Sequence, residues 1–394
     1  MMGNMSRLLK TLLDGAEKPL RTVVGLMSGT SVDSIDVAIC RIGPGPAPVR
    51  LLHFAERPFD PALKSRLTRV SDLKVRDIAE LHVLVGEAFA NACLVVLEDV
   101  GLNRDAVDLV GSHGQTVYHH SSIPGALRAT FQLGDGDVIA EQLGLPVISD
   151  FRARDIASGG EGAPISPRAD LVLYGASTFG SRRAILNLGG IANVTVLDSD
   201  PSLIFGFDTG PANALLDRAA RRLTAGQWNY DRDGLIAREG IVNEALLSDW
   251  LRRDEFIQQA PPKSTGFEMY GDDFLNRAEA LNGGLDANLM ATLTEFTARS
   301  IAIAFDRHIQ VDPPVDEIVV AGGGGANPIL MARIVENLAP RRIRRSEDFG
   351  IPTSAREAMA FAILADMALR GEASSLPSVT GARHAAVLGK LSFP

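Results

Sequence analysis

The 394-residue chain predicts an α/β protein built from two similar domains. Strand-like apolar runs alternate with helix-like runs, and glycine-rich turns separate them, which is typical of the α/β class. The chain is too long for one compact core, since single cores stop growing at about 250–300 residues. The start of the chain and its middle also share an approximate internal repeat, called the echo below. Together these observations favour two domains that face each other across a cleft.

The first unit of this echo is TVVGLMSGTSVDSIDVAIC, residues 22–40. An apolar run predicts a strand, the small residues 28–31 predict a turn, and the run after them predicts a second strand. The turn offers backbone N–H groups and hydroxyls, which are the donors that a polyphosphate needs. Asp33 and Asp36 follow closely, and carboxylates beside a phosphate site are typical of Mg²⁺ binding, directly or through water. Taken alone, the segment could also be an ordinary hairpin with a solvated turn.

The second unit of the echo is AILNLGGIANVTVL, residues 184–197, with the same order of apolar run, small-residue turn and apolar run. After each unit comes a strand that ends in glycine and a polar residue. These strands are predicted in VDLVGSHGQT (107–116) and IFGFDTGPAN (204–213), and the echo pairs them with each other.

Asp208 ends the second of these strands and precedes Thr209, Gly210 and Pro211. Pro211 suits the first turn of a following helix, so Asp208 or Thr209 could be an N-cap. The functional alternative is a carboxylate held at the end of a strand in the cleft. That placement suits a general base.

A late strand–turn–helix unit occurs in DEIVVAGGGGANPILMARIVENL, residues 316–338. Its four consecutive glycines would let a ligand lie against the backbone, with a helix N-terminus beyond them. A flexible connector is the alternative, but the position between a buried strand and a helix favours ligand contact. No Walker-type GxxxxGK[ST] loop is present, which excludes a P-loop enzyme.

Other polar clusters leave alternatives open. His113 is either a ligand contact or a satisfied structural histidine. Arg152, Arg154 and Asp155 are predicted to form a salt-bridged structural knot, with an anion site as the alternative. Lys263 is predicted to be an exposed loop lysine, with a phosphate-binding role as the alternative. Glu357 begins a predicted helix, where a carboxylate stabilises the helix dipole in any case.

Composition narrows the function classes. The net charge of −9 gives no support to nucleic-acid or acidic-membrane binding, which needs a basic face. Cys40 and Cys93 lie in apolar runs and are predicted to be buried thiols in a reducing compartment. The N-terminus lacks the features of a signal peptide, and residues 80–101 predict a buried helix rather than a membrane span. A cytoplasmic location is therefore expected.

Nine short motifs occur in one order across nearly the whole chain. They are GLMSGTSVDSIDVA, GSHGQTV, DFRARDIASGGEGAP, NLGGIANVT, GFDTGPAN, YDRDG, PPKSTG, GGGGAN and EAMAFA. Together they resemble the anhydro-N-acetylmuramic acid kinases of the sugar kinase, Hsp70 and actin superfamily, from about Val23 to Leu391. The resemblance implies two RNase H-like domains facing across a nucleotide- and sugar-binding cleft. It implies ATP, Mg²⁺ and 1,6-anhydro-N-acetylmuramate as ligands, and a homodimer without nucleic-acid or membrane partners.

Carried over residue by residue, the resemblance implies roles for particular positions. Asp208 would be the catalytic base, and Glu357 an active-site carboxylate near the sugar. The ATP phosphates would bind the hairpin residues Gly29, Thr30, Ser31, Val32, Asp33, Ser34, Ile35 and Asp36. The nucleotide would also contact Gly210, Gly322, Gly323, Gly324 and Asn327. Asp33 and Asp36 would hold the metal, directly or through water.

The expected domain bounds are 21–170 plus 371–394 for the first domain and 171–370 for the second. Residues 1–20 are expected to be an N-terminal extension that could be disordered. The chain departs from the family pattern at Ala212, where glycine is frequent, at Asp170, where histidine is usual, and at Phe267, where arginine is common. The last two departures concern peripheral sugar contacts. They leave a levoglucosan-type kinase as one alternative. A nucleotide-switched binding protein, as in the actin and Hsp70 branches of the superfamily, is a less favoured alternative.

Overall fold

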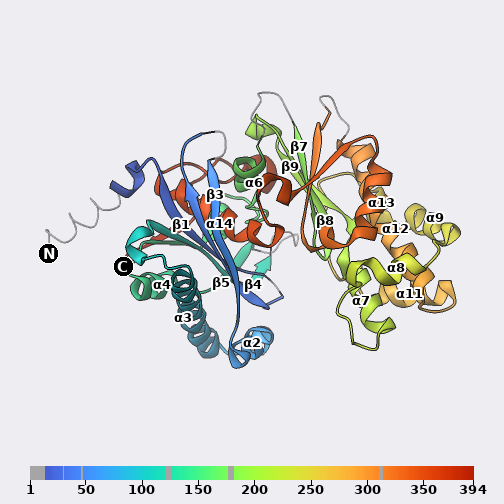
Figure 1. The fold of residues 1–394 in the computed structure, drawn as a ribbon, viewed down its shortest axis with the longest axis horizontal. Helices are drawn as coiled ribbons and strands as arrows, with labels where there is room; N and C mark the ends of the chain where they lie inside the picture. The colour runs from blue at the N-terminus through green and yellow to red at the C-terminus, as the bar shows by residue number, and fades with distance from the viewer. Residues whose placement is uncertain (1–13, 30, 46–47, 121–126, 176–181, 310–313) are drawn as a thin grey trace. The chain divides into compact units, whose positions relative to one another are not determined.

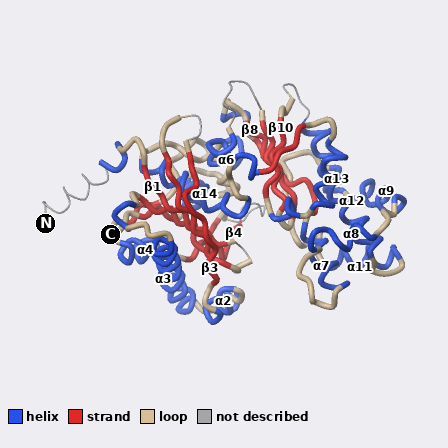
Figure 2. The backbone as a smooth tube through the Cα atoms, viewed as in Figure 1, coloured by secondary structure: helices blue, strands red, loops and turns tan. Residues whose placement is uncertain are grey.

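The computed structural model describes residues 14–29, 31–45, 48–120, 127–175, 182–309 and 314–394. The chain divides into two compact units, Met1–Ser177 with Ala355–Pro394 (unit 1) and Thr178–Ser354 (unit 2). Both have the α/β architecture that the alternating pattern predicted, and Figure 2 shows a core of strands flanked by helices in each.

Unit 1 is built on a mixed sheet with the strand order β12-β6-β4-β1-β2-β3, and β5 pairs with β4. Its strands are β1 (Arg21–Ser28), β2 (Ser34–Ile42), β3 (Val49–Pro58), β4 (Leu109–His120), β5 (Ala129–Leu133), β6 (Val147–Ser149) and β12 (Lys390–Ser392). Its helices are α2 (Pro61–Leu67), α3 (Val75–Asp99), α4 (Gly136–Leu143), α5 (Phe151–Ala157), α6 (Pro167–Tyr174), α14 (Arg356–Leu369) and α15 (Pro377–Thr380).

Strand β1 is buried along its whole length because helices cover both faces of the sheet. Val24 and Leu26 belong to the core that α3 closes with Val85 and Phe89. The opposite face carries Gly25, where a Cβ atom would lie 1.8 Å from the carbonyl oxygen of Ala358 in α14. Helix α14 therefore rests directly on the strand backbone, and both helices are seen beside this sheet in Figure 1.

This packing moves the expected domain boundary. The sequence analysis placed residues 171–370 in the second domain, but α14 contacts β1, β4 and β2 of unit 1. Gly111 on β4 provides the same close approach as Gly25, since its Cβ would lie 2.3 Å from the carbonyl oxygen of Phe361. Helix α14, and Glu357 with it, thus belongs to unit 1, and the chain crosses between units near residues 177 and 354.

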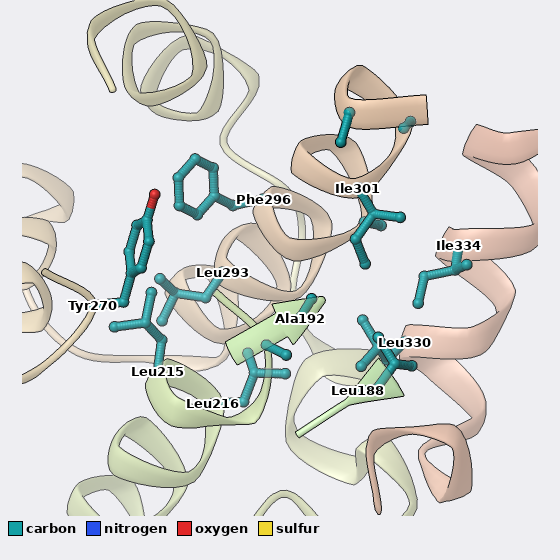
Figure 3. Packing of buried hydrophobic residues seen from close by; sticks show 14 of the residues in the cluster. Leu188, Ala192, Leu215, Leu216, Tyr270, Leu293, Phe296, Ile301, Leu330 and Ile334 are labelled. Atoms are coloured by element: carbon teal, nitrogen blue, oxygen red, sulfur yellow. The ribbon is translucent and has the colours of Figure 1, made fainter. Parts of the chain in front are cut away.

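Unit 2 contains a five-stranded sheet in the order β11-β10-β7-β8-β9. Its strands are β7 (Arg183–Leu188), β8 (Ile191–Leu197), β9 (Phe205–Pro211), β10 (Glu317–Ala321) and β11 (Arg342–Arg345). Its helices are α7 (Asn213–Leu223), α8 (Leu235–Glu239), α9 (Glu244–Arg253), α10 (Glu255–Gln258), α11 (Asp272–Asn282), α12 (Ala287–Ala304) and α13 (Pro328–Leu338). Figure 3 shows its core, where Leu215 of α7, Phe296 of α12 and Leu330 of α13 gather over the sheet residues Leu188 and Ala192.

The two sheets share one topology, which is the physical basis of the sequence echo. In each, three consecutive strands are antiparallel neighbours (β1-β2-β3 and β7-β8-β9), and the next two in order, β4 and β6 or β10 and β11, continue in parallel from the first. The echo paired residues 107–116 with 204–213, and this detail is wrong. Strand β4 lies parallel to β1 and matches β10, whereas β9 is antiparallel to β8 and matches β3.

Helix α3 is the one described helix that is long and apolar enough to cross a membrane by composition, with half of its most apolar window buried. Leu81, Val85 and Phe89 from this helix are fully buried in the unit 1 core, as expected for a core helix. Cys40 and Cys93 are buried and free, and burial raises the pKa of each thiol to about 12.

Candidate active site

The predicted phosphate turn joins β1 to β2, and neighbouring side chains hold it. Ser28 Oγ donates to Gln115 Oε1 on β4 (2.7 Å), and Gln115 Nε2 donates to the carbonyl oxygen of Gly29 (3.1 Å). Val32 has a φ of 55°, which is unusual for a β-branched residue, and its N–H donates to the same Gly29 oxygen. Such conformations persist where surrounding contacts impose them, and they cluster at ligand sites. Thr30, predicted here, lies outside the described residues.

The two carboxylates after the turn lie in different environments. Asp33 is exposed and accepts a hydrogen bond from Lys64 Nζ of α2 (2.8 Å), which, with the Ser31 hydroxyl, lowers its pKa. Asp36 is half-buried on β2 and accepts a hydrogen bond from Ser34 Oγ (2.9 Å). Burial raises the pKa of Asp36 to about 6, and the negative charges of Glu56 and Glu357 add to the effect. Within the described ranges, no three His, Cys, Asp or Glu side chains gather as metal ligands.

The other predicted residues of this hairpin contribute unequally. The side chains of Val32 and Ile35 are buried in the unit 1 core. Only their backbone groups could therefore face a ligand. Gly29 has room around it, because a Cβ atom there would meet nothing closer than Ser31 Oγ at 3.8 Å.

The raised pKa of Asp36 predicts a pH-dependent stability difference. The folded protein binds this proton more tightly than the unfolded chain, so ionising Asp36 costs stability as pH rises from about 4 to about 6. We expect Asp36→Asn to be more stable than the wild type at pH 8, with the gap closing near pH 4. Urea unfolding at several pH values measures it, and a gap that is constant with pH would contradict the assignment.

Glu357 lies in the first turn of α14, within electrostatic reach of Arg152. The sequence had instead placed Arg152 in a salt-bridged cluster with Arg154 and Asp155. Arg152 Nε donates to His113 Nε2 (2.9 Å), and Arg152 Nη1 donates to the carbonyl oxygen of Gly162 (3.0 Å). The charge of Glu357 partly offsets the lowering of the Arg152 pKa by burial. Carboxylate and guanidinium therefore lie within electrostatic reach of each other on unit 1.

His113 has a structural role here. It is buried, its Nδ1 contacts the carbonyl oxygen of Gly114 (3.0 Å), and its ring lies 4.4 Å from that of Phe361. Burial and the adjacent Arg152 hold its pKa well below the usual value, so the ring is neutral and Nε2 accepts from Arg152. Of the two alternatives for His113, the satisfied structural histidine is the one found.

The predicted knot of Arg152, Arg154 and Asp155 does not form. Asp155 is fully buried, but its oxygens accept from the backbone N–H of Gly162 (2.8 Å) and from Thr380 Oγ1 (2.9 Å). The side chain of Arg154 is exposed on α5 and makes no hydrogen bond or ion pair in the described part of the chain. The two arginines diverge because successive side chains of a helix point in different directions.

This arrangement predicts unequal costs of substitution. Arg154→Ala should change the free energy of unfolding by no more than about 0.5 kcal/mol, as is usual for a surface residue. Asp155→Ala should cost at least about 2 kcal/mol, because it leaves two buried donors without acceptors. Chemical denaturation of both variants tests this pair, and equal losses would contradict the contacts described.

Asp170, one departure from the family pattern, is not available to a ligand. It is fully buried on α6 and accepts two hydrogen bonds from Arg356, at 2.8 Å from Nε and 2.5 Å from Nη2. The pair ties α6 to the first turn of α14, next to Glu357. Phe267, the other departure, is exposed, and its ring lies 5.1 Å from the Arg218 guanidinium.

Asp208 is positioned by a loop of unit 2 rather than by a helix. It lies inside β9, in register with Asn193 of β8, and α7 begins only at Asn213, which excludes the N-cap alternative. Ser264 Oγ and the backbone N–H of Thr265 both donate to Asp208 Oδ2 at 2.9 Å. Among the described residues, Oδ1 receives no hydrogen bond. One oxygen is thus anchored and the other is left to accept a proton.

The surroundings of Asp208 favour a role as proton acceptor. Burial raises its pKa, while the donors from Thr265 and Ser264 and the charge of Lys263 act in the opposite direction. A carboxylate with a raised pKa is a stronger proton acceptor. Lys263 was predicted to be exposed, but it is buried. Its Nζ donates to the carbonyl oxygen of Phe256 (2.9 Å) and lies above the aromatic ring of the same residue.

The four-glycine turn follows β10 and packs against the end of β7. A Cβ atom on Gly322 would lie 2.6 Å from Leu188 N, and one on Gly324 would lie 2.8 Å from Leu188 Cβ, so packing alone requires both glycines. Gly323 has open space at its Cβ position. Its backbone is therefore the part of the turn that a ligand can approach.

Two further residues predicted to contact the nucleotide have structural duties. Asn327 caps α13, since its Oδ1 accepts from the N–H groups of Ile329 and Leu330. Gly210 is buried with a φ of 147°, and a Cβ there would lie 2.9 Å from Ser300 Oγ of α12.

Comparison with known proteins decides the family. The family model described as anhydro-N-acetylmuramic acid kinase matches residues 21–394. The chain belongs to the anhydro-N-acetylmuramic acid kinase family. An anhydro-N-acetylmuramic acid kinase from Caldanaerobacter subterraneus subsp. tengcongensis is 39% identical over 99% of this chain and 100% of its own length. One from Synechococcus elongatus is 40% identical over 93% of this chain and 98% of its own.

Among solved structures, an activator of 2-hydroxyisocaproyl-CoA dehydratase from Clostridium difficile with bound ADPNP is 12% identical, with a TM-score of 0.42. The match covers 89% of this chain and 96% of the activator.

In this member of the anhydro-N-acetylmuramic acid kinase family, two sets of contacts around the candidate site were not predicted from the sequence. Ser264 and Thr265 anchor Asp208, although they are separated from it by more than fifty residues. The PPKSTG motif was the available signal, because it contains both residues. Arg356 was also missed, and nothing in its local sequence indicates its buried partner Asp170.

Proposed function

We propose that this protein is an ATP-dependent kinase that opens 1,6-anhydro-N-acetylmuramate with water and phosphorylates O6. The products are N-acetylmuramate 6-phosphate and ADP, as cell-wall recycling requires. Membership of the anhydro-N-acetylmuramic acid kinase family supports the activity. The observation that carries the mechanism is Asp208, which has one anchored oxygen, one free oxygen and a raised pKa.

The proposed reaction joins two bond changes. Asp208 Oδ1 takes a proton from water as the water oxygen attacks C1 of the sugar. The bond between C1 and the bridging oxygen breaks, and its electron pair stays on that oxygen, O6. O6 then attacks the γ-phosphorus of ATP, and ADP leaves. Such phosphoryl transfers depend mainly on positioning and charge stabilisation.

Residues of unit 1 supply the other half of the proposed site. The phosphate turn with the free backbone around Gly29 would receive the phosphates of ATP, and the backbone at Gly323 of unit 2 would lie along the nucleotide. Glu357, within electrostatic reach of Arg152, would contact the sugar. We propose that the two units face each other across the cleft that binds both substrates, and that closure excludes bulk water.

Mg²⁺ would neutralise the transferring phosphoryl group when bound. Its usual donors in such sites are one or two carboxylates with waters and phosphates, and the residues after the turn fit that set. Asp36 is the better candidate, because the charge of Asp33 is already paired with Lys64, whereas no lysine or arginine pairs with Asp36 in the described part of the chain. We also propose that the protein is cytoplasmic and forms a homodimer.

The second candidate is a levoglucosan-type kinase. Two differences from the family sequence pattern supported it, and one of them, Phe267, is exposed and could contact a sugar. The burial of Asp170 removes the other. ADP release should be measured with each anhydrosugar. We expect a much higher kcat/KM with 1,6-anhydro-N-acetylmuramate. A preference for levoglucosan would favour the second candidate, and no turnover with either would favour a nucleotide-switched binding protein.

A further inference from the structure

A cavity of about 440 Å³ lies in unit 1, at the end of β1 away from the phosphate turn. Arg21 begins β1 and lines the cavity, whereas Ser28, at the other end of the strand, is about 23 Å away at about 3.3 Å per residue. The second half of α14 forms another wall, from Ile363 to Arg370. No residue proposed for catalysis or nucleotide binding lines this cavity.

Most charges around the cavity are paired within the protein. Arg21 donates to Asp366 and to the carbonyl oxygens of Ala16 and Lys18. Arg370 Nε donates to Asp366 (2.9 Å) and Nη1 pairs with Glu372. These contacts account for the two lining acids.

The remaining lining cations are Lys18 and Arg168. Lys18 Nζ pairs with Asp108 (2.5 Å). Arg168 is different, because no hydrogen bond or ion pair joins its side chain to any described residue, and its Nε is buried without an acceptor. A partly buried guanidinium without a counter-charge is costly, and an anion that binds its outer N–H groups would offset that cost.

The rest of the lining is apolar. It comprises Ala16, Pro19, Ile42, Gly43, Pro44, Pro48, Val172, Ile363 and Met367. A concave, mainly apolar site with a single unpaired polar group is the usual form of a small-molecule site, and the volume lies in the range of about 300–1,000 Å³ common for such sites.

We propose that this cavity binds a small organic monoanion, with its acidic group on Arg168 and its apolar body against Val172 and α14. One spare positive charge selects one negative charge, and the apolar walls select an aliphatic or ring body over a bare inorganic ion. The site lies at one end of α14 and Glu357 at the other, which gives the ligand a rigid element in common with the proposed active site.

Calorimetry of the full-length protein with hexanoate as the probe tests the proposal without reference to kinase activity. We expect hexanoate to bind at least about tenfold more tightly than hexan-1-ol, because the alcohol lacks the charge that pairs with Arg168. Arg168→Gln should lower the affinity for hexanoate by at least about tenfold and leave the affinity for hexan-1-ol unchanged. Arg76→Gln is the matched control, since Arg76 is exposed on α3 and pairs with Glu80 of the same helix, away from the cavity lining.

Val172→Asp tests the apolar wall and should abolish hexanoate binding. Circular dichroism and the unfolding midpoint establish that each variant is folded. No binding of hexanoate to the wild type, equal affinities for acid and alcohol, or an unchanged affinity in folded Arg168→Gln would each overturn the proposal.

Discussion

Asp208→Asn is expected to lower turnover by at least about 100-fold, the contribution typical of a positioned acid–base group. The amide oxygen can still accept hydrogen bonds from Ser264 and Thr265, so the loop and the fold should persist. The variant loses only the ability to take a proton from water. ATP and sugar affinities, measured by calorimetry, should therefore stay close to those of the wild type.

Ser264→Ala is the matched control for Asp208→Asn. It removes one of the two donors to Oδ2 and keeps the carboxylate, so its turnover should fall less than that of Asp208→Asn. Reaction of the wild type in ¹⁸O-labelled water should place the label on C1 of the sugar, read promptly before the hemiacetal exchanges. Label in the phosphate, or near-normal turnover of Asp208→Asn, would exclude Asp208 as the base.

The second large effect is expected at the buried pair of Asp170 and Arg356. Asp170→Asn should cost about 3–5 kcal/mol of folding free energy, because it leaves the Arg356 charge buried and unpaired. Arg356→Met should cost a similar amount for the converse reason. The double variant Asp170→Leu with Arg356→Met should recover most of the loss, since an apolar pair removes both charges together.

Urea unfolding at pH 7 measures these changes. Asp249→Asn is the control, because Asp249 is partly exposed and pairs with Arg252 and Arg253 on the surface. It should change the free energy of unfolding far less than Asp170→Asn does, because exposed ion pairs contribute little. A small effect of Asp170→Asn, or a double variant as unstable as the single ones, would contradict the pairing.

The sequence by itself determined the α/β class, the two strands on either side of the small residues 28–31, the strand that carries Asp208 and the glycine turn after β10. Each depends on local properties, namely apolar runs, small residues in turns and glycine's freedom, and these are written in consecutive residues. The family motifs belong to the same category, because each is a short segment in fixed order.

Only the tertiary structure decided which distant groups meet. Helix α14 joined unit 1 because Gly25 and Gly111 lie under it, which no pattern within the helix indicates. Lys263 can be buried because two carbonyl oxygens of α10 accept hydrogen bonds from its ammonium group. Asp170 proved to be the partner of Arg356, 186 residues away, and thus unavailable to a sugar. Long-range pairing of this kind depends on how the elements pack, and packing is set by many weak contacts that no single segment contains.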